Sequence, residues 1–238
     1  MEKKAWYFRN IVANVVLIAV LSVTIVFVWR TPANNVPALE PVRGGNCANS
    51  VSIAITLTRG ASGVDDILNV FAVHDIRATF FVSGVWGMEN LSSLKAVHAA
   101  GHELGNHGFF NETHVSLNPS RIREEIELTH SFVKTHTDVD MAVFMPPFQG
   151  YSVASIEIAR ALGYTTVAPR VLANQAPEVG LGHTPESLAV STLQNLKGGA
   201  FIVLDAGIVT ATALPQIIDG IAAQDLSIVP IYSVLAND

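Results

Sequence analysis

Few side chains in this chain of 238 residues have types and spacings that could carry hydrolytic or metal chemistry. Its single cysteine, Cys47, excludes a disulfide scaffold and any zinc or iron–sulfur site built from cysteines. His107 and His114 stand seven residues apart and could approach each other if the chain between them folded back. Two imidazoles fall short of the three protein ligands of a catalytic zinc ion. Asp65 and Asp66 are typical of the first turn of a helix, where the helix dipole favours acids.

These residues belong to a pattern in which short β-rich runs alternate with helical stretches from Val51 onward. Such alternation predicts parallel strands joined by crossover helices, in a barrel or a doubly wound sheet. Asn118 and Pro119 suit the N-cap and first turn of one helix, whose apolar face carries Ile122 and Ile126 while Glu124 and Glu127 face water. The expected strands cover residues 51–57, 78–84, 102–107, 141–147, 164–168, 200–205 and 226–232.

The first fifty residues differ from the rest in charge and hydropathy. Residues 11–29 carry no charge, and a helix of that length matches the hydrocarbon thickness of a bilayer. Because most nearby basic residues precede this run, it predicts a single-pass anchor, with residues 1–10 in the cytoplasm and the domain outside the cell membrane. A cleaved signal peptide is the alternative. Residues 30–50 are expected to form a linker.

Two further expectations follow from the composition. Cys47 lies in the linker, either as a free thiol or as one half of an intermolecular disulfide. Beyond residue 30 the chain has ten Lys and Arg against nineteen Asp and Glu. This acidic balance argues against a nucleic-acid partner, whose phosphates require clustered cations.

Several phrases in order over residues 51–236 resemble those of the polysaccharide deacetylases, the NodB homology domain of carbohydrate esterase family 4. They are IAITLTRG, ATFFVSG, GHELGNH, FMPPFQG and FIVLDAG. The resemblance implies a distorted (β/α)7 barrel with its site at the carboxyl ends of the strands. The family hydrolyses N-acetyl groups on chitin-like or peptidoglycan sugars with a divalent metal, which polarises the carbonyl and activates water. A carboxylate base, an acid for the leaving amine and an N–H for the oxyanion complete the reaction.

The first two motifs of the family are altered in this sequence. Where the resemblance places the base aspartate and the first metal ligand, the chain has Thr58 and Arg59. A threonine hydroxyl is no general base near neutral pH, and a guanidinium repels a cation. In the second motif His107 is retained, but Asn111 stands where the family has its second histidine. Only one of the three implied metal ligands is therefore present.

The later motifs have also changed. Met145 replaces the arginine that pairs with the base, and Asp205 replaces the catalytic histidine. Without a carboxylate at position 58, an arginine at 145 would be a buried unpaired charge, so Met145 fits the altered first motif. No tryptophan follows Trp86 to supply that of the fourth motif. The backbone N–H of Phe148 could still serve as an oxyanion donor, and an ion pair between Arg59 and Asp205 is expected at the barrel mouth.

The leading hypothesis is a membrane-anchored, catalytically inactive deacetylase-like protein that binds cell-wall glycan or a wall-assembly partner and holds no metal cofactor. The aromatic side chains expected to stack on sugar rings are Phe109, Phe110, Phe148 and Tyr151. The alternative is an active N-deacetylase with a rebuilt site, using zinc or another divalent metal on His107, His114 and Glu112. A purely structural wall protein without affinity for sugar is a third reading.

Overall fold

The computed structural model describes residues 39–172, 184–194 and 196–236. No helix in these three ranges is both long and apolar enough to cross a membrane. The span predicted at 11–29 lies outside the described residues, as do the predicted cytoplasmic segment and the first part of the linker.

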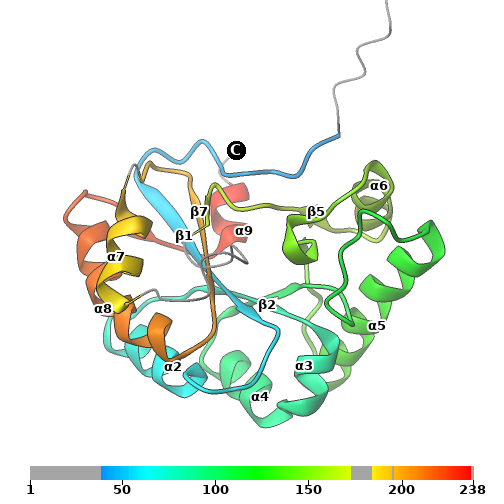
Figure 1. Ribbon diagram of the computed structural model, residues 1–238, viewed down its shortest axis with the longest axis horizontal. Helices are drawn as coiled ribbons and strands as arrows, with labels where there is room; N and C mark the ends of the chain where they lie inside the picture. Colours follow the sequence, from blue (N-terminus) through cyan, green and yellow to red (C-terminus); the bar gives the residue numbers. More distant parts are fainter. Residues whose placement is uncertain (1–38, 173–183, 195, 237–238) are drawn as a thin grey trace, which may run out of the picture. The chain divides into compact units, whose positions relative to one another are not determined.

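The described body is built around one sheet of parallel strands curled into an incomplete barrel (Figure 1). The order is β5-β4-β3-β2-β1-β7-β6, and β8 also pairs with β1. Because every pairing is parallel, helices must return the chain between strands. The strands are β1 (Ser50–Leu57), β2 (Thr79–Val82), β3 (Glu103–Asn106), β4 (Val143–Phe144), β5 (Thr165–Thr166), β6 (Val171–Leu172), β7 (Phe201–Asp205) and β8 (Ser227–Ile228).

Helices surround the sheet on all sides but one (Figure 1). Asn118 caps α5 as its sequence predicts, because its side chain accepts a hydrogen bond from the Arg121 amide at 3.0 Å. The helices are α2 (Val64–Val73), α3 (Gly84–Glu89), α4 (Leu91–Ala99), α5 (Pro119–Thr137), α6 (Val153–Ala161), α7 (Pro185–Leu193), α8 (Ile208–Ala222) and α9 (Ile231–Leu235), with a short 3-10 turn at Pro147–Gln149.

The chain end differs from the sequence-based expectation. Residues 226–232 were expected to form one strand, but β8 ends at Ile228 and α9 begins at Ile231. Pro230 explains the change, since it has no amide to continue a ladder and stands at the N-cap of α9. The α9 side chains Ile231 and Val234 belong to the apolar cluster inside the barrel, together with Phe81.

The open side of the helical ring is covered by residues 40–46, which we call the strap (Figure 1). Val42 bridges to Val167 beyond β5, and Gly44 bridges to Ala200 before β7, so the strap links the edge strand β5 to the start of β7, the neighbour of the other edge strand β6. The expected linker over 30–50 therefore ends earlier, because the chain belongs to the folded body from Glu40 onward. Cys47 packs against the barrel interior, with its Sγ 3.7 Å from the Val234 carbonyl oxygen.

Candidate functional site

The residues at the motif positions lie at the carboxyl ends of neighbouring strands. Thr58 follows β1, His107 follows β3, Met145 follows β4, and Asp205 is the last residue of β7. The register sets Thr56 of β1 opposite Asp205. Parallel strands thus bring together residues that are far apart in the sequence, in the arrangement that places chemistry at the carboxyl end of βα barrels.

The expected ion pair between Arg59 and Asp205 is wrong. Arg59 is exposed, and among the ion pairs of the described residues none joins it to Asp205. The Asp205 carboxylate instead accepts a hydrogen bond from the hydroxyl of Thr56 in the adjacent strand. An exposed guanidinium keeps its hydration. Pairing it with a half-buried acid would remove part of that hydration, and the ion pair would add little stabilising free energy in exchange.

His107 is buried and held by the backbone. Its Nδ1 lies 2.7 Å from the Met145 carbonyl oxygen, so Nδ1 carries the proton and donates. Burial lowers the pKa of His107 to about 4, which keeps the ring neutral at pH 7. Met145 is 2% exposed and packs in the apolar barrel interior, where an arginine would be an unpaired buried charge.

His114 is fully buried, with its ring 5.4 Å from that of Phe144. Neither of its ring nitrogens has a hydrogen-bond partner in the described part of the chain. Burial lowers the pKa of His114 to about 4. Its Nε2 lies close to Gly108, because a Cβ at position 108 would be 3.6 Å from this nitrogen.

These residues do not fit a catalytic metal ion. Within the three described ranges, no three His, Cys, Asp or Glu side chains stand close enough together to hold one. Asn111, at the place of the family's second histidine, has a left-handed backbone with φ of 57°. Glu112, considered for a rebuilt site, has its carboxylate 3.9 Å from the Arg121 guanidinium. Among the described residues, His107, His114 and Glu112 therefore do not form the ligand set that a rebuilt metal centre would need.

Glu125 positions the loop after β3 and was not singled out from the sequence. It is fully buried on α5, and its Oε2 accepts hydrogen bonds from the amides of Phe109 at 2.7 Å and Phe110 at 2.8 Å. Its Oε1 lies 3.0 Å from the Arg121 guanidinium, a contact whose angle is too poor for a hydrogen bond but which is a close ion pair. Desolvation raises the pKa of Glu125, although the two amide donors and the Arg121 charge act to lower it. The sequence does contain a feature that indicates its burial, since Glu125 lies three residues after Ile122, on the apolar face of the helix.

The four aromatic candidates differ in exposure. Phe148 is 69% exposed and Phe110 is 45% exposed, while Phe109 and Tyr151 are half-buried. The Phe109 ring occupies the space where a Cβ on Gly84 would stand, so it packs against the start of α3. Phe148 and Gln149 both have φ of 54°, a left-handed conformation that is uncommon for such residues and stores strain at the barrel mouth.

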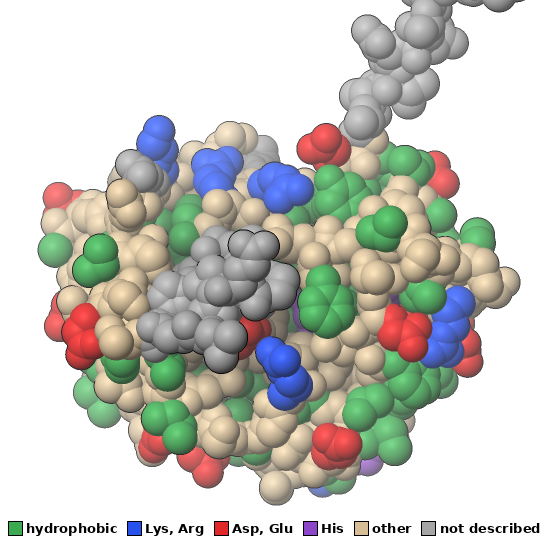
Figure 2. Space-filling model, in the orientation of Figure 1, with side chains coloured by type: hydrophobic (Ala, Val, Ile, Leu, Met, Phe, Trp, Pro, Cys, Tyr) green, Lys and Arg blue, Asp and Glu red, His purple; other side chains and the backbone are tan. Residues whose placement is uncertain are grey.

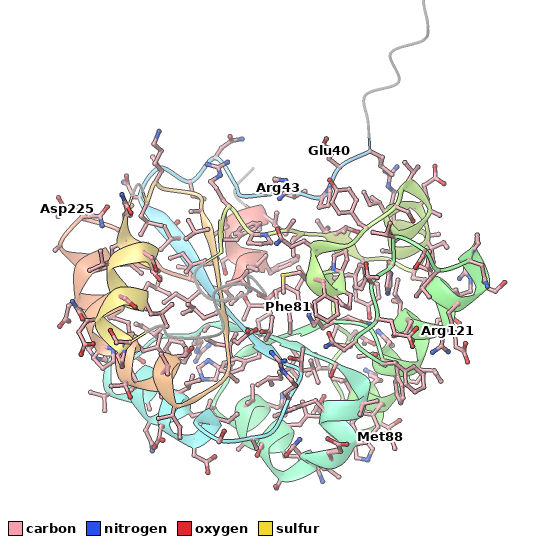
Figure 3. All side chains as sticks on the ribbon, viewed as in Figure 1. Glu40, Arg43, Phe81, Met88, Arg121 and Asp225 are labelled. Atoms are coloured by element: carbon pink, nitrogen blue, oxygen red, sulfur yellow. The ribbon has the colours of Figure 1, made fainter. Side chains whose placement is uncertain are left out.

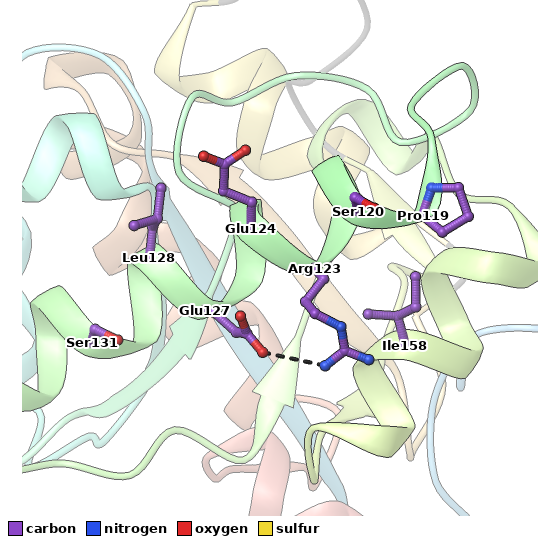
Figure 4. Close-up of a pocket in the computed structure, with 8 residues that line it drawn as sticks. All are labelled: Pro119, Ser120, Arg123, Glu124, Glu127, Leu128, Ser131 and Ile158. Atoms are coloured by element: carbon purple, nitrogen blue, oxygen red, sulfur yellow. Dashed lines mark hydrogen bonds and ion pairs between the residues drawn. The ribbon is translucent and has the colours of Figure 1, made fainter.

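On the face of the described body shown in Figure 2, hydrophobic, basic and acidic side chains are interspersed with tan surface. Phe81, which belongs to the apolar cluster inside the barrel, lies near the middle of the view in Figure 3. A groove of about 490 Å³ lies elsewhere, along α5, where Leu128 and Ile158 line it beside an ion pair of Arg123 and Glu127 at 3.2 Å (Figure 4). This groove lacks the residues of the family motifs.

Comparison with known proteins decides the family. The model of the polysaccharide deacetylase family matches residues 45–167, about half of the chain. The chain belongs to the polysaccharide deacetylase family. The resemblance of the motifs is thereby confirmed, and the parallel strands form an α/β half-barrel like that of the family's solved structures.

Individual members of the family are more distant. The uncharacterized protein YlxY of Bacillus subtilis is 27% identical over 182 residues, which are 75% of this chain and 55% of YlxY. The peptidoglycan-N-acetylmuramic acid deacetylase PdaA of Bacillus subtilis is 26% identical over 102 residues, 42% of this chain and 39% of PdaA. The chain thus spans at most about half the length of these curated relatives.

Among solved structures, BA3943 of Bacillus anthracis, described as a pseudoenzyme of carbohydrate esterase family 4, superimposes with a TM-score of 0.77. The two are 24% identical, and the alignment covers 83% of this chain and 70% of BA3943. At this identity the likeness shows a shared fold.

Proposed function

We propose that this protein is a catalytically inactive polysaccharide deacetylase-like protein that binds cell-wall glycan or a wall-assembly partner. The observation that carries the proposal is the pair Thr58 and Arg59, which stand where the family has its base and first metal ligand. A hydroxyl cannot take the proton of water at neutral pH, and a guanidinium opposes a cation. The domain works without a metal cofactor, outside the cytoplasm, on a membrane anchor at residues 11–29.

The surroundings of the other motif positions agree with this proposal. The Asp205 carboxylate is engaged by Thr56, so it is not placed as a free acid or base at the mouth. The His107 ring donates a hydrogen bond to the Met145 carbonyl oxygen, which gives this histidine a structural role. The backbone N–H of Phe148 is the part of the machinery that needs no side chain, and it could hold a sugar carbonyl without hydrolysing it.

The exposed aromatic side chains support glycan binding in preference to a purely structural role. Phe148 keeps a left-handed backbone that presents its ring to solvent. A strained, exposed aromatic residue costs stability, and such strain persists where it serves a site. Phe110 also reaches solvent, beneath the Arg121 guanidinium at 4.6 Å from the ring centre. We assign the stacking role to Phe148, Phe110 and Tyr151, with the Phe109 ring packed against that of Phe110.

The test compares the full chain with a restored variant carrying Thr58→Asp, Arg59→Asp and Asn111→His. Zinc binding is measured by calorimetry, and acetate release is measured on N-acetylated chitin fragments and peptidoglycan. We expect no stoichiometric zinc on the wild type and gain of zinc binding in the variant. A mutant of BA3943, a pseudoenzyme of carbohydrate esterase family 4, is described as having restored enzymatic activity.

Binding of the protein to the same glycans can be measured even when no acetate is released. We expect Phe148→Ala to weaken retention on insoluble peptidoglycan, while Val190→Ala, an exposed apolar change on α7, leaves retention unchanged. One tightly bound zinc and acetate release by the wild type would overturn the inactive assignment. Failure of every glycan to retain the wild type would leave a protein partner as the ligand.

A further inference from the structure

Three basic residues from distant parts of the chain lie in the strap or in segments beside it. Arg43 lies in the strap, Arg170 precedes β6, and Lys197 lies in the turn before β7. The Arg170 guanidinium stands 3.2 Å from the place where a Cβ on Gly44 would be. Gly44 in turn bridges to Ala200, three residues beyond Lys197. We call Arg43, Arg170 and Lys197 the basic patch.

The basic patch is not neutralised within the described residues. Arg43, Arg170 and Lys197 are all exposed. None of the ion pairs formed among the described side chains includes any of the three. Arg43 donates to a backbone oxygen, that of Pro169, at 3.4 Å. Blue side chains gather along this edge of the molecule in Figure 2.

The acidic neighbour of the basic patch is Glu40, at the start of the strap (Figure 3). No ion pair within 4.0 Å joins Glu40 to Arg43. Even when the Glu40 carboxylate is counted, the described residues along the strap carry an excess of positive charge. The excess opposes the balance of the chain beyond residue 30, which is strongly acidic. An acidic body with one basic edge would be repelled by an anionic surface in every other orientation.

We propose that the basic patch is a docking surface for a membrane that contains anionic lipids. Its place in the chain favours a lipid surface, because the folded body begins at Glu40, the first residue of the strap. Only ten residues separate the apolar run 11–29 from Glu40, and ten extended residues reach at most about 35 Å. Cations this close to a bilayer interact with anionic headgroups, each strengthening the association about fivefold.

The helical ring is open only on the strap side, so docking there needs no helix to move (Figure 1). The strap lies along the side of the barrel, whereas the motif residues lie at the carboxyl ends of the strands. Contact through the basic patch therefore leaves the barrel mouth uncovered. The domain would be held sideways on the membrane, with its glycan-facing end accessible.

The test uses the full chain reconstituted into phosphatidylcholine vesicles with or without phosphatidylglycerol. Hydrogen–deuterium exchange is measured on peptides covering 40–46 and 196–200, which reports contact whether or not residues 11–29 insert. We expect slower exchange of these peptides on the anionic vesicles alone, and loss of that protection at high salt.

Two double variants with equal charge changes complete the test. Arg170→Gln with Lys197→Gln is expected to lower surface association roughly thirtyfold and abolish the added protection. Arg43 is kept because its side chain bonds the strap to Pro169. The control double variant is Arg77→Gln with Lys95→Gln. Both residues are exposed and far along the chain from the strap, so we expect this variant to keep the added protection on anionic vesicles.

Three results would overturn the proposal. They are equal exchange on neutral and anionic vesicles, equal effects of the two double variants, and protection by a soluble glycerol phosphate polymer but not by vesicles. Because zinc, acetate and peptidoglycan play no part here, failure of this proposal leaves the proposed function untouched.

Discussion

Glu125 is the single residue on which the loop after β3 most depends. Its carboxylate satisfies two backbone amides, of Phe109 and Phe110, and pairs with Arg121. Arg121 in turn lies over the Phe110 ring. One buried acid thus fixes the aromatic segment that we assign to glycan binding, in the segment that follows His107.

We expect Glu125→Ala to destabilise the protein by about 3 kcal/mol, because it leaves two loop amides and a guanidinium without their acceptor. The matched control is Glu124→Ala, which also removes a partner of Arg121, at 2.7 Å, but from a side chain that is 52% exposed. We expect the control to cost less than about 1 kcal/mol. Urea denaturation measures both, and equal losses would contradict the role assigned to Glu125.

At the scale of helices and strands, the sequence predicts what depends on local pattern. Alternating β-rich and helical runs located the described parallel strands except β6, and Asn118 located the start of α5. The strap and α9 were not predicted, because each is held by contacts with segments far along the chain. Arg59 was placed wrongly for a related reason. Its expected partner Asp205 accepts a hydrogen bond from Thr56, the penultimate residue of a predicted strand.

The strap gives a prediction at this scale. Gly44 has φ of 153°, and a Cβ there would stand 2.4 Å from the Gly199 carbonyl oxygen, which accepts the bond from the Gly45 amide. Gly44→Ala is therefore expected to push the strap from β7, at a cost of about 1–3 kcal/mol. The control is Gly207→Ala, since nothing described lies within 4 Å of a Cβ there.

Hydrogen exchange at the strap distinguishes local opening from global unfolding. In Gly44→Ala the Gly45 amide is expected to lose protection while amides of β1 keep theirs, because β1 lies between β2 and β7 within the sheet. Unchanged exchange of Gly45 would show that the strap does not depend on this close approach.

At the scale of the whole molecule, the barrel buries three neutral histidines. His102, His107 and His114 each have a pKa lowered to about 4, in each case first by burial. Unfolding returns them to water, where the pKa is about 6.5. Between these values the unfolded chain binds more protons, so their contribution to stability is complete above pH 6.5 and is lost as pH falls toward 4. Glu103 and Glu125 oppose this trend, because burial raises their pKa values.

His114→Phe separates one histidine from these opposing groups. The ring of His114 packs on Phe144, and its nitrogens have no described hydrogen-bond partner, so an apolar ring of similar shape removes no known bond. We expect the variant to match or exceed the wild type at pH 7. Below pH 6.5 its advantage should grow by up to about 1.4 kcal/mol per pH unit, since one fewer proton binds on unfolding. His98→Phe, at an exposed position of α4, is expected to give a curve parallel to the wild type. Urea denaturation from pH 7 to pH 4.5 measures all three proteins, and a His114→Phe curve that also runs parallel would mean that His114 takes up a proton equally in the folded and unfolded states.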